Sequence, residues 1–380
     1  MSKFTKLELY TAKGNNFHLN EDYLKPYKDD VIRFLADEDY MHSLKFAKKM
    51  MISQEIKANN VIEGINNDLS TIDEVIKSKS HLSDRERKRI INLYHGYQYI
   101  LSNQTIDEAH LTELYSYLSD GLLDNHDKIF HDEFFYRTKP VFISKGVITD
   151  DDLYTGMGPD KIKSYMNKFF EYVNNNDSIE TDIDVFIKSQ IMHLYFVYVH
   201  PYLDVNGRSS RTVAMWYLLN HESYPYIIFN RAIAFAGRDY YANIVTSRHH
   251  GDLTLFLKFM LKHVLIELEK EYVVHNIDVN SNQKLNNEEL QILEYILTMK
   301  GNLTAKDLAS IYNQYNEKRK VSIIYIEKII PLIEKGIILD KGNTKGMIER
   351  NMPNINISIN PDIVNVDESK IKYLKLECYI

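Results

Sequence analysis

The sequence predicts a protein that is almost entirely helical, and three observations support this fold class. Only 14 Gly and 8 Pro occur in 380 residues, which is too few for a turn-rich sandwich or barrel. Apolar residues make up 44% and charged residues 26%, the balance of a globular protein, which excludes a disordered chain. Long apolar segments recur at helical spacing. At roughly 150 residues per domain, the length suggests two or three domains.

Residues 1–125 are predicted to form an N-terminal helical region. Residues 1–35 are polar and aromatic without strong periodicity, so no element is assigned to them. A helix is expected over about 41–61, where apolar residues recur near the 3.6 period, and it should end at Glu63-Gly64 because glycine commonly terminates helices. Cap signals from Asp or Thr predict two further helices over 84–102 and 107–123.

Residues 126–272 are predicted to form the core domain. The apolar run Val141-Phe142-Ile143, the turn 144–146 and Val147-Ile148 predict a β-hairpin, and 154–159 should be a loop. The segments 183–199 and 209–220 are apolar nearly all round, as expected of buried helices. A helix over about 252–271 completes this core.

The remainder is predicted to be a linker, a module and a tail. Residues 273–287 turn polar and rich in Asn, which favours a linker. Three amphipathic helices and two apolar strand segments over 288–360 predict a winged-helix-like module, followed by a tail over 361–380.

Charge and composition narrow the function classes. The net charge of −7 argues against a surface that binds polyanions as a whole, so DNA binding would need a local patch such as Lys318-Arg319-Lys320 on the module. Packing, dimerisation or target recruitment are alternative roles for the module. The single Cys378 excludes an internal disulfide framework and a Cys-based zinc site. No secretion signal or membrane span is visible, so a cytoplasmic protein without membrane contact is expected.

Between the two apolar core helices lies a short polar segment that concentrates chemistry. Asn206-Gly207 opens the second helix, whose free N–H groups and positive dipole end suit a phosphate. Arg208 and Arg211 lie on one helix face and can bind further phosphate oxygens. Asp204 is an oxygen ligand of the kind that Mg²⁺ accepts, and His200 is a candidate general base.

This segment resembles the signature of the Fic family, H-x-F-x-(D/E)-G-N-(G/K)-R-x-x-R. The match covers His, Asp, Asn, Gly and both Arg positions. Tyr202 replaces the Phe, and Val205 replaces the first Gly. Because a β-branched residue adopts a positive φ only at a cost, either this loop does not need positive φ at Val205 or its anion binding is weakened, and we expect the first.

The resemblance implies a Fic-type helical core with a small hairpin flap, and transfer of AMP from ATP to a Tyr, Thr or Ser hydroxyl of a protein, the chain itself included. His200 would deprotonate the hydroxyl and Asp204 would hold Mg²⁺. The phosphates would lie against Asn206, Gly207, Arg208 and Arg211. The family branch with Lys at the position of Gly207 acts as a kinase, so Gly207 favours adenylyl transfer.

Three more segments resemble parts of this family. The flap that aligns a target segment corresponds to Val141, Phe142, Ile143 and Ser144. Tyr240 and Tyr241 correspond to the segment that lines the adenine pocket, although core packing is an equal alternative for them.

The helix expected over about 41–64 resembles the inhibitory helix (S/T)-x-x-x-E-(G/N) of many Fic proteins. Glu63 and Gly64 fit this pattern, and Asn59 stands where Ser or Thr is usual. By this analogy Glu63 pairs with Arg211 and prevents productive ATP binding. Alternatives are an enzyme that removes AMP or transfers another group, and an ATP-sensing DNA-binding regulator. A homodimer is a further expectation.

Overall fold

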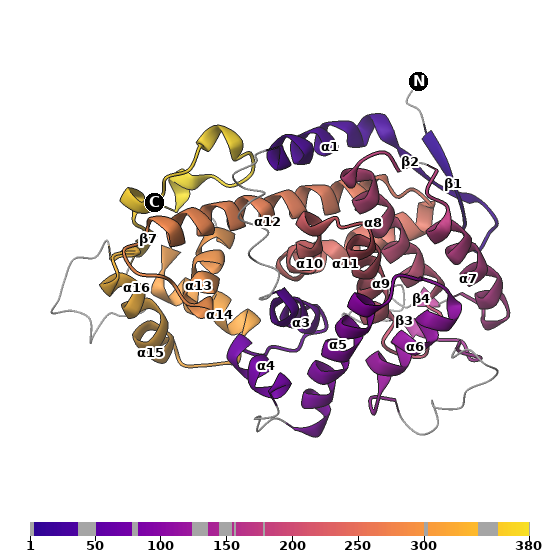
Figure 1. The fold of residues 1–380 in the computed structure, drawn as a ribbon, viewed down its shortest axis with the longest axis horizontal. Helices are drawn as coiled ribbons and strands as arrows, with labels where there is room; N and C mark the ends of the chain where they lie inside the picture. The colour runs from indigo at the N-terminus through magenta and orange to yellow at the C-terminus, as the bar shows by residue number, and fades with distance from the viewer. Residues whose placement is uncertain are drawn as a thin grey trace.

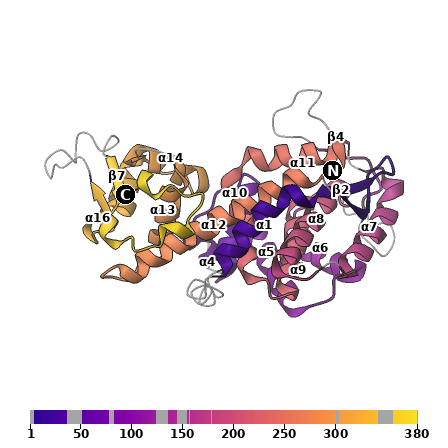
Figure 2. The ribbon, with the colours of Figure 1, turned by 90° about the horizontal axis from the view of Figure 1, so that it is seen from above.

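The computed structural model describes residues 4–36, 51–77, 83–123, 136–143, 154–155, 157–177, 179–299, 303–340 and 356–379. Helices dominate these ranges, and the few strands form three small sheets. Figure 1 shows the long helix α12 (Thr254–Asn280) running along the molecule. In Figure 2 the C-terminal part of the chain lies at one end of α12 and the other helices gather round the rest of it. None of the described helices is long and apolar enough to cross a membrane.

The chain begins with an antiparallel hairpin and a helix that the sequence did not predict. The strands β1 (Phe4–Tyr10) and β2 (Asn16–Asn20) pair, and α1 (Glu21–Leu35) follows. Phe17 and Leu19 alternate into the core from β2, but this period-2 pattern is too short to stand out in the sequence. The helix α1 packs along α12 (Figure 1), so long-range packing rather than a local pattern stabilises this segment.

The next helices in the described part of the chain are α3 (Met51–Ile62), α4 (Leu69–Ile76), α5 (Asp84–Ser102) and α6 (Glu108–Ser119). The predicted helices over 84–102 and 107–123 are confirmed, although α6 ends at Ser119. The helix predicted over 41–61 is confirmed from Met51 onward, and residues 41–50 lie outside the described ranges. The short helix α4 was not predicted.

The core consists of helices packed round α8 (Asp182–Val199), which is buried along most of its length. The paired helix α9 (Asn206–Asn220) is its closest neighbour, as predicted from two apolar segments. The elements around them are α7 (Pro159–Asn174), a 3-10 turn (Tyr224–Ile228), α10 (Phe229–Ala236) and α11 (Arg238–His250).

The first strand of the predicted hairpin is observed, and among the described residues it pairs with a segment that was not predicted to be a strand. Strand β3 (Phe142–Ile143) pairs with β4 (Tyr154–Thr155), within a segment that was expected to be a loop. The expected partner Val147-Ile148, and Ser144 of the expected flap, lie outside the described residues. Two strands of two residues carry almost no sequence periodicity, so the choice of partner depends on tertiary contacts.

The predicted linker over 273–287 is wrong for its first half, because α12 continues unbroken to Asn280. Val273, Val274 and Ile277 are buried within the C-terminal hydrophobic cluster. Polar residues between these apolar positions made the segment look like a linker. The helix instead extends from the core into the following cluster and fixes one to the other.

The C-terminal module (residues 287–379) has its own hydrophobic cluster. Its helices are α13 (Asn287–Thr298), α14 (Ala305–Tyr315), α15 (Val321–Ile324) and α16 (Ile330–Glu334), with a π-helical turn over Tyr325–Ile329. The strands β5 (Leu303–Thr304), β6 (Ile338–Asp340) and β7 (Asn356–Ile359) form a sheet in the order β5-β7-β6. The three predicted helices and two predicted strands are observed, with the third helix divided into α15, the π-helical turn and α16, whereas β5 was not predicted. The winged-helix assignment stays a prediction. The tail is not separate, because Leu374, Leu376 and Tyr379 are buried in the cluster.

Candidate active site

The polar segment between α8 and α9 is a tight loop with two residues in the left-handed region. His200 has φ 54° and closes α8, and Val205 has φ 66° directly before α9. The expectation that no positive φ is needed at Val205 is therefore wrong. The left-handed conformation costs a non-glycine residue about 1–2 kcal/mol. Burial of the valine side chain, which is 3% exposed, contributes about 1.5–3 kcal/mol and offsets that cost.

Asn206 and Tyr202 hold this loop in shape. The Asn206 Oδ1 accepts from the backbone N–H of Tyr202 at 2.9 Å, and its Nδ2 donates to the Tyr202 carbonyl at 2.8 Å. The Tyr202 ring stacks on Tyr115 with 3.7 Å between the ring centroids. The aromatic replacement thus still anchors the loop. Because the Asn206 side chain is held by Tyr202 within the loop, the backbone N–H groups at the start of α9 are the main donors that this part of the loop offers to a phosphate.

Arg208 and Arg211 project from the first turns of α9 and are both buried. Arg211 is 1% exposed, its Nε donates to the Asn59 Oδ1 at 2.7 Å, and its Nη2 donates to the Glu63 carboxylate. Arg208 is 6% exposed, and its Nε and Nη1 have no hydrogen-bond partner among the described residues. Buried donors are nearly always paired, so unpaired guanidinium nitrogens indicate a position for an anionic ligand.

Glu63 lies at the end of α3, where Gly64 shapes the turn. Gly64 has φ 75°, and the backbone N–H of Ile65 returns to the Asn60 carbonyl at 2.9 Å, so glycine is needed for its conformation. Burial would raise the pKa of Glu63, but Arg211, with Arg208 and Arg89, lowers it below its ordinary value. The carboxylate is therefore ionised and paired, as the sequence predicted for Glu63 and Arg211.

Asn59 and Gly207 complete the surroundings of Glu63. The Asn59 Nδ2 donates to the Tyr97 hydroxyl at 2.7 Å while its Oδ1 receives Arg211, so the asparagine both donates and accepts. A Cβ at Gly207 would lie 2.9 Å from the Glu63 Oε1 and 3.2 Å from the Arg211 Nη1. Glycine at position 207 is therefore what allows Glu63 to approach the start of α9.

Arg137 connects the segment before β3 to the loop that carries His200. Its backbone N–H donates to the Pro201 carbonyl at 2.9 Å, and its Nε donates to the His200 carbonyl at 2.7 Å. Its other nitrogens donate to the carbonyls of Lys139, at 2.8 Å, and Met157. Burial and then the charge of Arg137 lower the pKa of His200 to about 4. The imidazole is neutral near pH 7 and can accept a proton.

The two tyrosines have different environments. Tyr240 is 1% exposed and its hydroxyl lies 2.7 Å from the His193 Nε2, within the core. Tyr241 is 44% exposed, and its hydroxyl donates to the Ile62 carbonyl at 3.1 Å, at the end of α3. Tyr240 is thus enclosed but interacts with Arg211 as well as with the core, and Tyr241 lies beside Glu63 at the edge of the site.

Asp204 is exposed on the loop between α8 and α9, and its Oδ1 accepts a hydrogen bond from the backbone N–H of Val205 at 2.6 Å. In the described part of the chain, no group of three His, Cys, Asp or Glu side chains could hold a metal ion. A Mg²⁺ here would draw its remaining oxygen ligands from a nucleotide and water, which is the usual arrangement for this ion.

Arg89 of α5 is a candidate site residue that the sequence analysis missed. Its Nε is buried and has no hydrogen-bond partner among the described residues, and its charge lowers the pKa of both Glu63 and Arg208. It lies more than a hundred residues before the polar loop, so no spacing in the sequence indicated it. Three arginines thus surround one carboxylate, and the excess positive charge favours a polyanion.

The fold and the site define a helical domain with an arginine-lined anion site at the start of a buried helix. Residues 105–218 match the model of the Fic/DOC family. Among similar solved structures is a Fic family protein from Desulfovibrio desulfuricans G20, with a TM-score of 0.53 and 17% identity, covering 88% of this chain and 96% of that one. This likeness confirms the Fic-type helical fold.

Two curated relatives are similar in sequence. "Protein adenylyltransferase Fic" of Nematostella vectensis is 25% identical over 228 residues, which are 58% of this chain and 48% of that protein. "Protein adenylyltransferase fic-1" of Caenorhabditis elegans is 24% identical over 196 residues, which are 47% and 37% of the two chains. The chain therefore spans less than half the length of these relatives.

Proposed function

We propose that this protein is an adenylyltransferase, which transfers AMP from ATP to a Tyr, Thr or Ser hydroxyl of a protein and is inhibited by its own Glu63. The observation that carries the proposal is the buried guanidinium of Arg208. Among the described residues, two of its nitrogens have no hydrogen-bond partner, and they lie beside the Glu63–Arg211 ion pair at the N-terminus of α9. The names of the two curated relatives support the same reaction.

The residues of the loop have separate roles in this reaction. Arg208, Arg211 and the first N–H groups of α9, from Asn206 and Gly207, bind the phosphates. The attacking hydroxyl oxygen forms a bond to the α-phosphorus, the bond from that phosphorus to the bridging oxygen breaks, and diphosphate leaves. The hydroxyl proton passes to His200, which is neutral because its pKa is about 4. Positioning and charge stabilisation supply most of the catalysis.

Mg²⁺ and ATP fit the residues present. Asp204 is the carboxylate that would hold the ion, and when bound the ion neutralises charge on the phosphates. The Asp204 side chain is exposed at the mouth of the loop, so the metal does not need to be buried in protein. Tyr241, which is exposed at the edge of the site, would contact the nucleotide, and Tyr240 would support Arg211 from within the core.

Inhibition follows from competition for Arg211. The Glu63 carboxylate occupies this guanidinium, which a terminal phosphate of ATP would otherwise bind. Gly207 leaves room for the carboxylate, since any larger residue would contact it. If ATP binds while Glu63 remains in place, it cannot contact Arg211. Its α-phosphate would then not be aligned for attack by the target hydroxyl.

The flap is the place where a target would bind. Residues Val141, Phe142, Ile143 and Ser144 would align an extended target segment by strand addition. Arg137 ties the start of this segment to the His200 loop, so a target held there would lie close to the base. Autoadenylylation and a homodimer are compatible with this arrangement.

Label transfer tests the proposal. Wild type, Glu63→Gly and Glu63→Gly/His200→Ala would be incubated with Mg²⁺ and ATP labelled on the alpha or the gamma phosphate, with and without a cytosolic extract. Alpha label on protein that is strongest in Glu63→Gly and absent without His200 supports adenylyl transfer. Gamma label alone would indicate a kinase, and no label in any variant would favour a nucleotide sensor.

A further inference from the structure

The helix α3 lies between the Fic core and the C-terminal module and contacts each with a different face. Glu55, Asn59 and Glu63 are four residues apart and share one face, because about 3.6 residues make a helical turn. Asn59 and Glu63 both bind Arg211, and the Glu55 Oε2 receives a hydrogen bond from the Asn230 Nδ2 at 2.9 Å. This face is directed at the core.

The opposite face of α3 is directed at the C-terminal module. Lys57 and Val61 lie there, and Val61 packs against the hydrophobic cluster of the module. Lys57 is 5% exposed, and its Nζ donates to the Gln291 Oε1 at 2.9 Å and to the Asn316 Oδ1. Both acceptors are neutral amides of the module, so the buried ammonium depends on the module for its hydrogen bonds.

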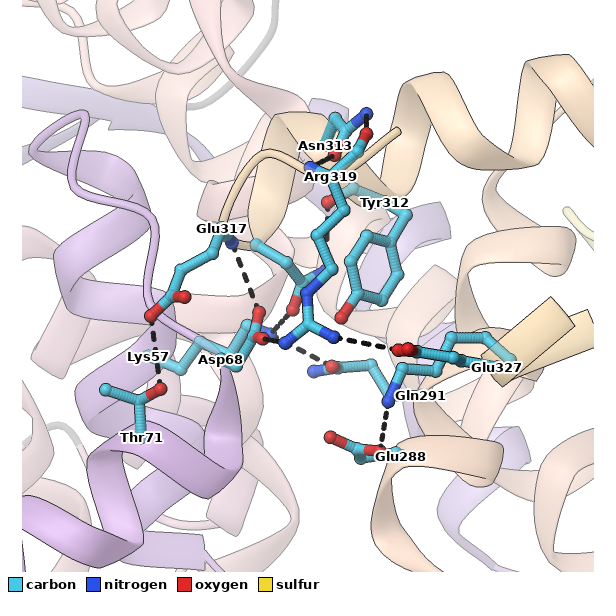
Figure 3. A network of polar contacts seen from close by, with 12 residues as sticks. Lys57, Asp68, Thr71, Glu288, Gln291, Tyr312, Asn313, Glu317, Arg319 and Glu327 are labelled. Carbon is cyan, nitrogen blue, oxygen red and sulfur yellow. Dashed lines mark hydrogen bonds and ion pairs between the residues drawn. The ribbon is translucent and has the colours of Figure 1, made fainter. Parts of the chain in front are cut away.

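A second contact lies just beyond Glu63, at the start of α4 (Figure 3). Asp68 is the residue before α4, where a carboxylate usually caps its own helix. It makes no such cap and is only 2% exposed. Its Oδ2 instead binds the Arg319 Nη2 at 2.9 Å, and its Oδ1 accepts from the backbone N–H of Glu317 at 3.1 Å. Both carboxylate oxygens of Asp68 therefore bind residues of the C-terminal module.

The module holds Arg319 in a fixed position for this contact. The Asn313 Oδ1 accepts from the backbone N–H of Arg319 at 2.7 Å, and Glu327 binds the Arg319 Nη1 at 3.1 Å (Figure 3). The Glu317 Oε1 accepts from the Thr71 hydroxyl at 3.1 Å, which ties α4 to the same turn. The segment 316–319 therefore binds Lys57 of α3 and Asp68 at the start of α4. These two residues lie before and after Glu63 in the sequence.

From these contacts we infer that the C-terminal module is the regulatory domain of the site, and that it holds Glu63 on Arg211 through the turn 316–319. A change in the module that withdraws Arg319 from Asp68 frees the segment on which Glu63 lies. This inference rests on the proposed inhibitory role of Glu63, but the physical coupling between the module and α3 can be measured without it.

Two substitutions in the full-length chain test the coupling. Arg319→Gln removes the ion pair from the module side, and Asp68→Asn removes it from the α4 side while keeping an acceptor for the Glu317 N–H. Hydrogen exchange of the amides over 59–64 should become about fivefold faster or more in each variant, the range typical of coupling between sites. Adenylyl transfer should rise by a similar factor. The double variant should show no more than either single change, because both remove one interaction.

Lys318→Gln is the matched control, because it removes a neighbouring exposed charge that forms no ion pair with α3 or α4 in the described part of the chain. It should leave exchange and transfer unchanged. Unchanged exchange over 59–64 in both Asp68→Asn and Arg319→Gln would overturn the inference, whatever the activity. If exchange rises but Glu63→Gly transfers no AMP, the coupling stands and the proposed function fails. If the Arg319 and Asp68 variants raise transfer further in a Glu63→Gly background, the module does not act through Glu63 and the inference is overturned.

Discussion

Replacing Glu63 with glycine should increase adenylyl transfer by about one to two orders of magnitude. The Glu63 side chain is 33% exposed and its partner Arg211 is 1% exposed, so the pair is shielded on one side. A hydrogen bond to a charged group contributes about 1.5–3 kcal/mol, somewhat less than the roughly 3–5 kcal/mol lost when a fully buried pair is broken. ATP must displace this interaction to bind Arg211. Each 1.36 kcal/mol is a factor of ten, so the expected gain is about 10- to 150-fold.

The assay is the initial rate of AMP incorporation at a fixed ATP concentration below saturation. Glu63→Gln retains an acceptor for Arg211 without the charge and should give an intermediate rate. Glu74→Gln, an exposed change on the neighbouring helix α4, should match wild type. Equal rates for wild type and Glu63→Gly would show that the ion pair does not limit ATP binding, and the inhibitory assignment would be wrong.

Three further predictions concern the base, the third arginine and the strained loop. Because the pKa of His200 is about 4, the base stays neutral as the pH falls from 7.5 to about 5.5, and kcat/KM of Glu63→Gly should be constant over this range. A fall of kcat/KM with a midpoint near pH 6.5 would contradict this. In the Glu63→Gly background, Arg89→Gln should raise KM for ATP about tenfold with little change in kcat. Arg85→Gln, at the exposed start of α5, should leave KM unchanged. If the two variants have equal KM values, Arg89 is not part of the site. Val205→Ala relieves the clash of a β-branched residue at positive φ. In urea unfolding it should therefore lower the free energy of unfolding by about 1 kcal/mol less than Val213→Ala, a substitution at a similarly buried position of α9. Equal losses would show that Val205 is not strained.

Helices with long apolar patterns could be predicted from the sequence, and short or mixed elements could not. The segments 183–199 and 209–220 are apolar on nearly every face, and both became buried helices of the core. The strand β4 has two residues, and the end of α12 alternates polar with apolar positions. In both places the local pattern is weak, so packing against distant residues decides the structure.

The candidate site divides in the same way. A single stretch of the chain holds His200, Asp204, Arg208 and Arg211, so their proximity follows from the sequence. Arg89 and Arg137 reach the site from other elements, and no spacing relates them to the loop. The left-handed conformation at Val205 was also missed, because burial of its side chain offsets a local cost that the sequence alone suggested would be avoided.

The helical class, the two core helices and the residues of the loop between them could all be predicted from the sequence, because these features depend on periodicity and on neighbours along the chain. The pairing of Glu63 with Arg211 was implied by the family resemblance alone, and it is the folding of the chain that brings the two side chains together. Nothing in the sequence indicated that Asp68 is bound by Arg319 rather than capping its own helix. These partners are separated by 148 and 251 residues. Ion pairs across such separations exist only because the packing of α3 between core and module brings the charges together.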